Sequence, residues 1–138
     1  MDFSLTPDQQ GLIEGLANAL EPFDDAYWLA CDRDARFPDA FVQAMADGGW
    51  LGIALPEEHG GAGLGVTEAA LMMLEVAKKG GMSAASAIHM NIFGPRSLVK
   101  FGTADQCARW LPDIISGTTR TCFSVTEKQV REIGRAHV

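Results

Sequence analysis

A short run close to residue 127 carries the side chains whose types and spacing could do chemistry. Phe123 and Val125 alternate there with the hydroxyl residues Ser124 and Thr126, and this period of two is typical of a β-strand. Hydroxyl groups can donate and accept hydrogen bonds to a bound molecule. Because the segments before this run have helical patterns, the run predicts that a second domain begins here. The chemistry would then lie at the seam between two domains.

The cysteines and histidines do not form a metal-binding pattern. The cysteines are odd in number, widely spaced and without a CxxC pair: Cys31, Cys107 and Cys122. This usage is typical of reduced thiols packed as small hydrophobic side chains. The histidines have no ligand spacing relative to the cysteines or to each other: His59, His89 and His137. We therefore predict no metal site.

The glycine-rich stretch at residues 60–65 invites comparison with phosphate-binding loops. The sequence lacks the GxxxxGK[ST] pattern, and GxGxxG fails because Val66 stands where the third glycine would be. The stretch is better interpreted as a flexible connection before the next helix.

Composition and charge exclude several classes of partner. The chain has 138 residues, 47% of them hydrophobic, which is enough for one core. A net charge of −7 argues against nucleic-acid backbones and anionic membranes as partners. No run of about 20 apolar residues could span a bilayer, and the first residues lack a secretory pattern. We expect a cytoplasmic protein.

Capping boxes mark the starts of two predicted helices. Thr6 and Gln9 form the first box, with Pro7 at the first helical position, and Thr103 and Gln106 form the second. The first helix presents an apolar stripe made of Leu12, Leu16 and Leu20. The second ends at Gly117 and is predicted to bury a face made of Trp110, Leu111, Ile114 and Ile115.

Three more helices are predicted, over about residues 38–47, 67–79 and 83–101, while residues 23–37 either extend the first helix or form a loop. The helix at 67–79 is apolar nearly all round, which predicts a central place in the bundle, and Gly80 and Gly81 end it. Gly94 and Pro95 should kink or break the helix at 83–101. The predicted fold class is all-α, an up-down helical bundle of about five helices that ends in a strand.

Four stretches, in this order, resemble the N-terminal helical domain of the acyl-CoA dehydrogenase family. They are residues 3–6, the proline-, glutamate- and glycine-rich joint at 52–63, residues 100–106 with 110–112, and residues 123–127. Family members combine a helical domain, a small β-barrel domain and a C-terminal helical domain. The resemblance therefore implies a helical domain at 1–121 and the first strand of a missing β-barrel, the middle β-domain, at 122–127.

The resemblance also implies an activity. Family members are FAD-dependent oxidoreductases of fatty acid metabolism that act on CH–CH groups and carry out α,β-dehydrogenation of an acyl-CoA thioester. They pass electrons to an electron-transferring flavoprotein, usually as homo-oligomers. The catalytic glutamate of most members lies in the C-terminal domain, so no catalytic residue is assigned here. The helix at 83–101 resembles the one that floors the acyl cavity, which Met90 and Phe93 could line, although core packing is the favoured explanation for these two residues.

The cofactor-binding residues that the resemblance implies lie along the flavin ring of FAD. They are Phe123, Ser124, Val125 and Thr126. Backbone N–H groups and the Thr126 hydroxyl would donate hydrogen bonds to the polar edge of the flavin, where negative charge builds up during hydride transfer. Ser124 carries a competing hydroxyl.

Residues 128–138 depart from the family pattern. Lys128 replaces a proline, a substrate-contacting serine is absent, and residues 133–138 match one reading frame of a sequencing adapter. We interpret 128–138 as a non-native tail, and we expect the chain alone to bind FAD weakly or not at all and to be inactive. Two alternatives stay open: a stand-alone helical protein-interaction module, and an oxidase-type relative of the same flavoprotein family.

Overall fold

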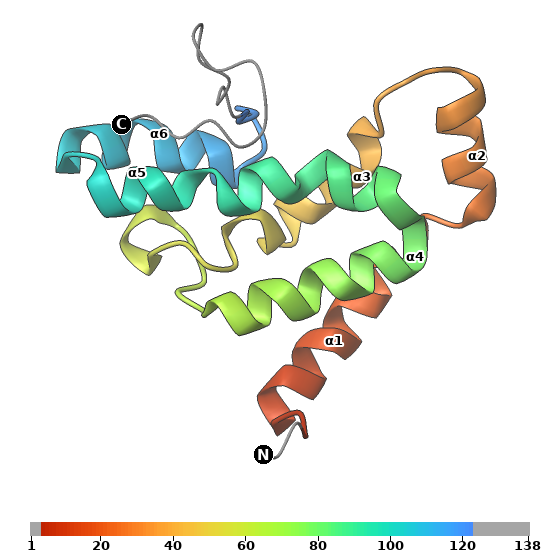
Figure 1. Cartoon of the computed structure of the whole chain (residues 1–138), viewed down its shortest axis with the longest axis horizontal. Coiled ribbons are helices and arrows are strands. Elements are labelled where there is room, and N and C mark those ends of the chain that lie inside the picture. Colours follow the sequence, from red (N-terminus) through yellow and green to blue (C-terminus); the bar gives the residue numbers. More distant parts are fainter. Residues whose placement is uncertain (1–3, 123–138) are drawn as a thin grey trace, which may run out of the picture.

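The computed structural model describes residues 4–122, and this part of the chain is all-α, as predicted (Figure 1). Two short 3-10 turns, η1 at Trp50–Gly52 and η2 at Glu57–His59, lie between α3 and α4. The predicted strand at 123–127 lies outside the described residues. The α-helices are α1 (Pro7–Leu20), α2 (Asp25–Arg33), α3 (Asp39–Asp47), α4 (Val66–Phe93), α5 (Pro95–Phe101) and α6 (Ala104–Ile115).

Both predicted capping boxes are present. The Thr6 hydroxyl accepts a hydrogen bond from the Gln9 amide (3.2 Å), and the Gln9 side chain accepts one from the Thr6 amide (3.1 Å). Thr103 and Gln106 form the same reciprocal pair at the start of α6, at 3.2 and 2.9 Å. These bonds satisfy backbone donors that have no partner inside a helix, so each helix start is fixed locally by the sequence.

The glycine pair after residue 79 turns α4 back on itself. Gly81 has left-handed backbone angles (φ 60°, ψ −149°), and the two legs of α4 run in nearly opposite directions on either side of it (Figure 1). A Cβ atom at Gly80 would lie 2.5 Å from the indole ring of Trp28, so glycine is needed there for close packing. The prediction that the helix ends at Gly80 and Gly81 is therefore confirmed, because the helical path is interrupted at Gly81 and the chain reverses its direction there.

Residues 23–37, which the sequence left open between helix extension and loop, contain the separate helix α2. Asp24 caps it by accepting a hydrogen bond from the Tyr27 amide (2.9 Å). The rings of Phe23 and Tyr27 pack edge to face at 4.9 Å, and those of Trp28 and Phe41 at 5.1 Å. This aromatic group attaches α2 to α3.

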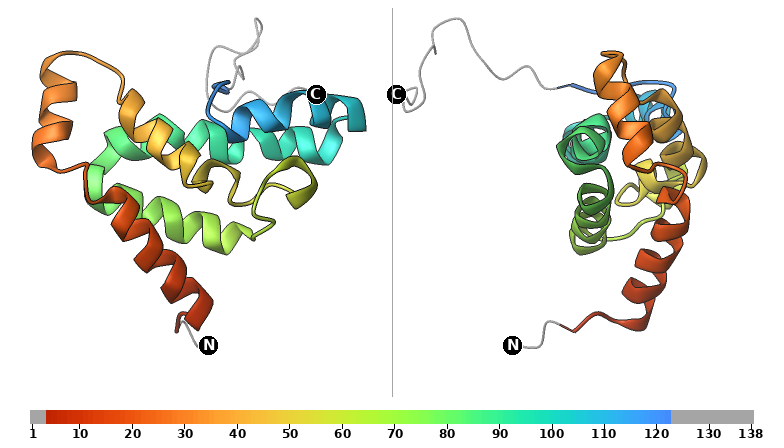
Figure 2. Two further views of the ribbon diagram at one scale, coloured as in Figure 1. Left: turned by 180° about the vertical axis from the view of Figure 1, so that it is seen from behind. Right: turned by 90° about the vertical axis from the view of Figure 1, so that its right-hand side faces the viewer.

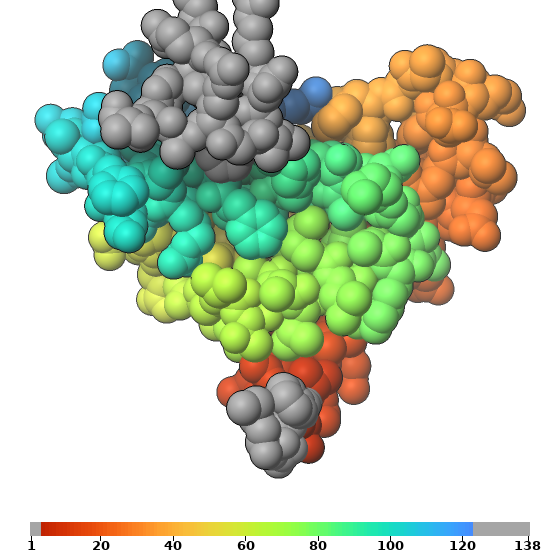
Figure 3. All heavy atoms as spheres, viewed as in Figure 1, coloured from red at the N-terminus to blue at the C-terminus, as the bar shows by residue number. Residues whose placement is uncertain are grey.

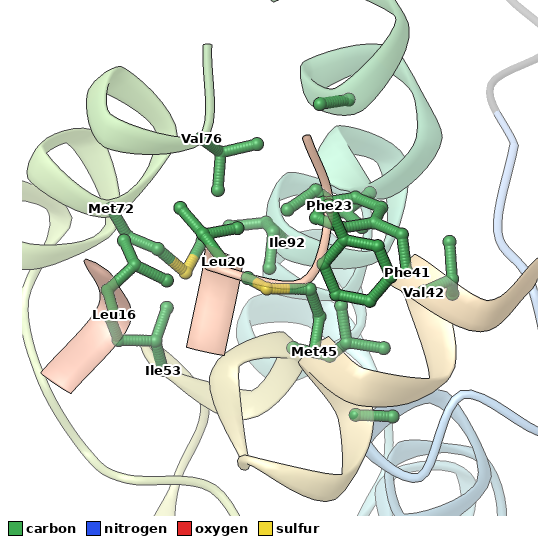
Figure 4. Packing of buried hydrophobic residues seen from close by; sticks show 14 of the residues in the cluster. Leu16, Leu20, Phe23, Phe41, Val42, Met45, Ile53, Met72, Val76 and Ile92 are labelled. Atoms are coloured by element: carbon green, nitrogen blue, oxygen red, sulfur yellow. The ribbon is translucent and has the colours of Figure 1, made fainter. Parts of the chain in front are cut away.

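The core lies between two layers. In the right-hand view of Figure 2, α4 forms one layer, and α1, α3 and α6 form the other. Figure 4 shows side chains from α1, α3, η1 and both legs of α4 meeting in one cluster. Its largest fully buried members include Leu16, Phe41, Met45, Leu51, Met72, Ile88 and Ile92.

Two burial predictions were wrong. The first leg of α4 is not buried all round: Leu74 is 51% exposed, whereas Met72 and Val76 on the same leg are fully buried. Trp110 is 42% exposed although Leu111 and Ile114 on the same helix are buried, as predicted. An apolar pattern predicts that a helix has a face to bury, but it does not say which neighbours are present to cover it.

Candidate functional site

The chain segment that follows α6 returns to the end of α4, and the described residues end there, at Cys122. Gly117, with a φ of 75°, turns the chain after α6, and residues 118–122 then pass the break between α4 and α5. This stretch, residues 116–122, is called the exit segment below. It leads directly to the residues that the sequence analysis assigned to cofactor binding.

Asn91, near the end of α4, binds the exit segment with both ends of its amide. Its Nδ2 donates to the carbonyl oxygen of Thr119 (2.9 Å) and to that of Ile114 (3.3 Å). Its Oδ1 accepts from the backbone amide of Thr121 (2.9 Å). Asn91 is only 6% exposed, so these hydrogen bonds replace the water that its amide would otherwise contact.

The helix break beside Asn91 makes room for this contact. The Thr121 hydroxyl donates to the carbonyl of Met90 (2.6 Å), which also accepts from the Gly94 amide (2.8 Å). A Cβ atom at Gly94 would lie 2.9 Å from the Thr121 hydroxyl oxygen. Pro95 then starts α5 and contributes no backbone donor. The predicted break at Gly94 and Pro95 is confirmed, and it admits the exit segment.

The opposite side of the exit segment is attached to the start of α3. Arg120 forms an ion pair with Asp39, and its guanidinium lies over the ring of Phe37, 4.0 Å from the ring centroid. Both charged side chains are more than half exposed, so solvent screens the pair. The exit segment is thus held by buried neutral hydrogen bonds on one side and by an exposed cation on the other.

A hollow of about 350 Å³ lies beside these contacts. Trp110, which was predicted to be buried, lines it, and this explains its partial exposure. Cys122 lines it as well and is exposed. The other lining residues are Gly94, Pro95, Ser97, Leu98, Ile114, Thr119 and Thr121. The hollow is mainly apolar, and its hydroxyl side chains are Ser97, Thr119 and Thr121.

Three groups among the described residues have clearly shifted pKa values, and all lie outside this hollow: Tyr27, Glu68 and Arg33, whose pKa is raised by its hydrogen bond with Asp34. Burial raises the pKa of Tyr27, and a hydrogen bond from the Phe41 amide partly opposes the shift. The Gln9 side chain donates to Glu68 (2.9 Å) and holds the pKa of that carboxyl below its ordinary value. The groups that contact Asn91 are neutral backbone amides and carbonyls. Such groups can hold the exit segment in place, but they do not carry out acid–base chemistry.

The predicted cofactor-binding residues, Phe123 to Thr126, lie outside the described residues, as does the predicted tail at 128–138. Within residues 4–122, no group of three or more histidine, cysteine or acidic side chains could hold a metal ion, and no helix is long and apolar enough to cross a membrane. Sequence reasoning missed Asn91, Arg120 and Thr121. One signal for Asn91 was present, since it is an amide three positions after Ile88 and four after Ala87, at the spacing of the apolar face of this helix.

A family model and two relatives match this chain over most of its length. The family model described as acyl-CoA dehydrogenase, N-terminal domain, matches residues 6–118. The acryloyl-CoA reductase (NADH) of Anaerotignum propionicum is 34% identical over 132 residues, which are 92% of this chain and 32% of the relative. The acyl-CoA dehydrogenase FadE12 of Mycobacterium tuberculosis (strain ATCC 25618 / H37Rv) is 33% identical over 129 residues, which are 91% of this chain and 32% of the relative.

A solved structure has the same fold. It comes from work on the electron transferring flavoprotein of Acidaminococcus fermentans, towards a mechanism of flavin-based electron bifurcation, and it superposes with a TM-score of 0.82 at 30% identity. The match covers 94% of this chain and 34% of the other. This chain therefore spans about a third of the length of the proteins that it matches.

Proposed function

This chain belongs to the acyl-CoA dehydrogenase family, and we propose that it forms the N-terminal helical part of an FAD-dependent oxidoreductase that dehydrogenates an acyl-CoA thioester at its α,β bond. The observation that supports the proposal is the place where the exit segment ends. The exit segment is fixed beside an apolar hollow immediately before Phe123, the first residue assigned to the flavin.

The described residues fit one part of such a site. The hollow of about 350 Å³ is at the small end of ligand pockets, which range over about 300–1,000 Å³. It has room for part of an acyl chain or ring system and not for a whole dinucleotide. Bound FAD would supply the hydride acceptor. Thr126 and the backbone N–H groups of residues 123–126 would hold its polar edge by donating hydrogen bonds.

Several finer assignments belong to the same proposal. Residues 1–121 would form the helical domain, 122–127 the start of the middle β-domain, and 128–138 a non-native tail. An electron-transferring flavoprotein is the proposed electron acceptor, and the description of the similar solved structure supports it. The whole protein would be a cytoplasmic homo-oligomer.

A second candidate is reduction of the same carbon–carbon bond. The observation in its favour is that the relative from Anaerotignum propionicum is named as an acryloyl-CoA reductase that uses NADH. Both candidates need a flavin beside residues 123–126 and an acyl-CoA beneath it. They differ in the direction of electron flow, so one flavoprotein preparation can test both.

The test is a chimera in which residues 1–127 replace the matching third of the Anaerotignum propionicum relative. We expect it to bind FAD stoichiometrically, seen as the visible absorption of oxidised flavin. Saturated acyl-CoA should bleach that absorption if the chain supports dehydrogenation. NADH followed by an unsaturated acyl-CoA should give turnover if it supports reduction.

The matched variants are Thr126→Val and Thr118→Val. Thr118 is an exposed hydroxyl that bonds to Ser116 and serves as the control. Thr126→Val should slow flavin reduction about tenfold or more, because a donor to the developing negative charge is lost, whereas Thr118→Val should not. A folded chimera without flavin, or equal rates for the two variants, would overturn the proposal.

A further inference from the structure

We propose that Gln9 and Glu68 form a latch: their contact holds the first two turns of α1, residues 7–13, against the start of α4. When the latch opens, these two turns detach while the rest of α1 stays in the core. The inference goes beyond the proposed function. It involves no flavin and no acyl-CoA, so its tests are separate from those of the proposed function.

The latch joins the caps of two helices that are far apart in the sequence. The side-chain oxygen of Gln9 accepts a hydrogen bond from the Thr6 amide (3.1 Å), and its nitrogen donates one to a carboxylate oxygen of Glu68 (2.9 Å). The other carboxylate oxygen of Glu68 accepts a hydrogen bond from the Gly65 amide (3.0 Å), which caps α4. One chain of hydrogen bonds therefore runs from the start of α1 to the start of α4.

The apolar contacts of α1 are concentrated in its second half. Leu16 and Leu20 are 0% and 3% exposed, and Figure 4 shows both among the core side chains. In the first half, residues 7–15, no residue is buried, although Leu12 and Ile13 are half-buried. Most of the stability of a helix in a protein comes from the packing of its apolar face. The first two turns of α1 therefore depend more on their polar contact than the rest of the helix does.

Two glycines weaken the same half of α1. A Cβ atom at Gly11 would meet nothing within 4 Å, and one at Gly15 would make an ordinary contact with Trp50 (3.8 Å). Packing therefore requires glycine at neither position, while glycine lowers the tendency of the segment to stay helical. Within residues 4–122, Gln9 is the one residue of α1 whose side chain forms a hydrogen bond with another helix. Loss of that bond should therefore release this half of the helix before the other.

The first test uses the 138-residue chain and amide hydrogen exchange by NMR. In Glu68→Leu we expect the amides of residues 10–13 to exchange about tenfold faster, because these turns lose their anchor, while those of residues 19–20 keep their rates. Glu75→Leu is the matched control, since Glu75 lies on the same leg of α4 and pairs with Lys78. Unchanged rates at residues 10–13 in a folded Glu68→Leu protein would overturn the inference. Equal acceleration along the whole of α1 would overturn it too.

The second test opens the latch from the side of α1. Gln9→Leu also removes half of a capping box, so Gln106→Leu, which removes the same half of the box at α6, measures the loss of the cap alone. We expect Gln9→Leu to accelerate exchange at residues 10–13 about threefold more than Gln106→Leu does at residues 107–110. The double variant of Gln9→Leu with Glu68→Leu should exchange no faster than the faster single variant. Additive effects of the two substitutions would contradict the latch.

The Glu68 carboxyl reports directly whether the latch is closed. The hydrogen bond from Gln9 is the main cause that holds the pKa of Glu68 below its ordinary value. In Gln9→Leu this pKa should therefore rise, whereas in Gln106→Leu it should stay as it is in the unmodified chain. An NMR titration of the Glu68 carboxyl carbon measures both. The same pKa in all three proteins would contradict the contact on which the inference stands.

A last measurement needs no variant, in case the substituted proteins do not fold. Gln10, the exposed glutamine next to Gln9, is the reference in the unmodified chain. The side-chain N–H₂ protons of Gln9 should exchange several-fold more slowly than those of Gln10, because the Gln9 nitrogen donates to a carboxylate. Equal rates for the two side chains would show that the latch is open in solution and would overturn the inference.

Discussion

Different forces hold the aromatic cluster around Phe41 and the exit segment around Asn91. Phe41 is fully buried and meets the rings of Phe23 and Trp28 edge to face. The exit segment is held by the amide of Asn91 and the hydroxyl of Thr121. Apolar burial stabilises without setting a direction, whereas hydrogen bonds add little net stability and fix positions closely. We infer that the cluster supplies most of the stability and the exit segment supplies the geometry.

The largest expected effect comes from emptying the cluster. Phe41→Ala should lower the free energy of unfolding by about 3–5 kcal/mol, because it removes a fully buried ring and leaves a cavity. Phe101→Ala, at a ring that is 78% exposed, should change it by less than about 0.5 kcal/mol. Urea titration of both variants checks the comparison. Similar losses in the two would mean that the cluster does not dominate stability.

A smaller loss is expected where α2 packs against the reversal of α4. Gly80→Ala would place a Cβ atom 2.5 Å from the Trp28 ring, and the resulting shift should cost about 1–3 kcal/mol. Gly11→Ala, in α1 with open space around it, should instead stabilise by about 0.5–1 kcal/mol. Thermal unfolding of the two variants measures whether each one lowers or raises the stability. A neutral Gly80→Ala would show that Trp28 can move without cost.

A substitution in the exit segment should loosen the position of that segment more than it lowers the stability of the whole protein. Thr121→Val removes the donor to the Met90 carbonyl, which keeps its bond from Gly94, so the loss should be about 1 kcal/mol. Hydrogen exchange should quicken at residues 119–122 and stay unchanged in α1 and α3. Uniformly faster exchange throughout would contradict the division into two regions.

The smallest effect is expected at the exposed side of the exit segment. Arg120→Gln removes an ion pair whose partners are both largely exposed, so stability should fall by about 1 kcal/mol or less, and the difference should shrink in high salt. Arg33→Gln, which breaks the exposed pair with Asp34, is the matched control. A loss that is large and independent of salt would mean that Arg120 acts by packing on Phe37.

Local signals explain how much of the fold could be predicted from the sequence. The boxes at Thr6 and Thr103 and the breaks at Gly81 and Pro95 depend on neighbouring residues, and the structure has all of them. The predictions that failed, for Trp110 and for the first leg of α4, depended on which surfaces meet. That information is spread over residues far apart in the chain, and periodicity does not contain it.

The candidate site was predictable only in part. The change of pattern near residue 122 predicts a seam between two domains after α6, and this stays a prediction because the residues beyond Cys122 lie outside the described part of the chain. The contacts of Asn91 with Thr119 and Thr121 join residues 28 and 30 positions apart, so no local motif announces them. An amide at the spacing of the apolar face, three positions after Ile88, could have marked Asn91, although not its partners.

The outer face of α4 and α5 has a practical consequence for handling the protein. Figure 3 shows these helices spread across one side of the molecule, and Val66, Leu74, Phe93 and Phe101 on them are all at least 40% exposed. Apolar side chains that face water at this density promote self-association as concentration rises. Light scattering should therefore detect clusters that grow with sulfate and dissolve in dilute urea, since sulfate strengthens and urea weakens apolar contact. The exposed apolar side chains of α4 and α5 thus determine how strongly copies of the isolated chain associate in solution.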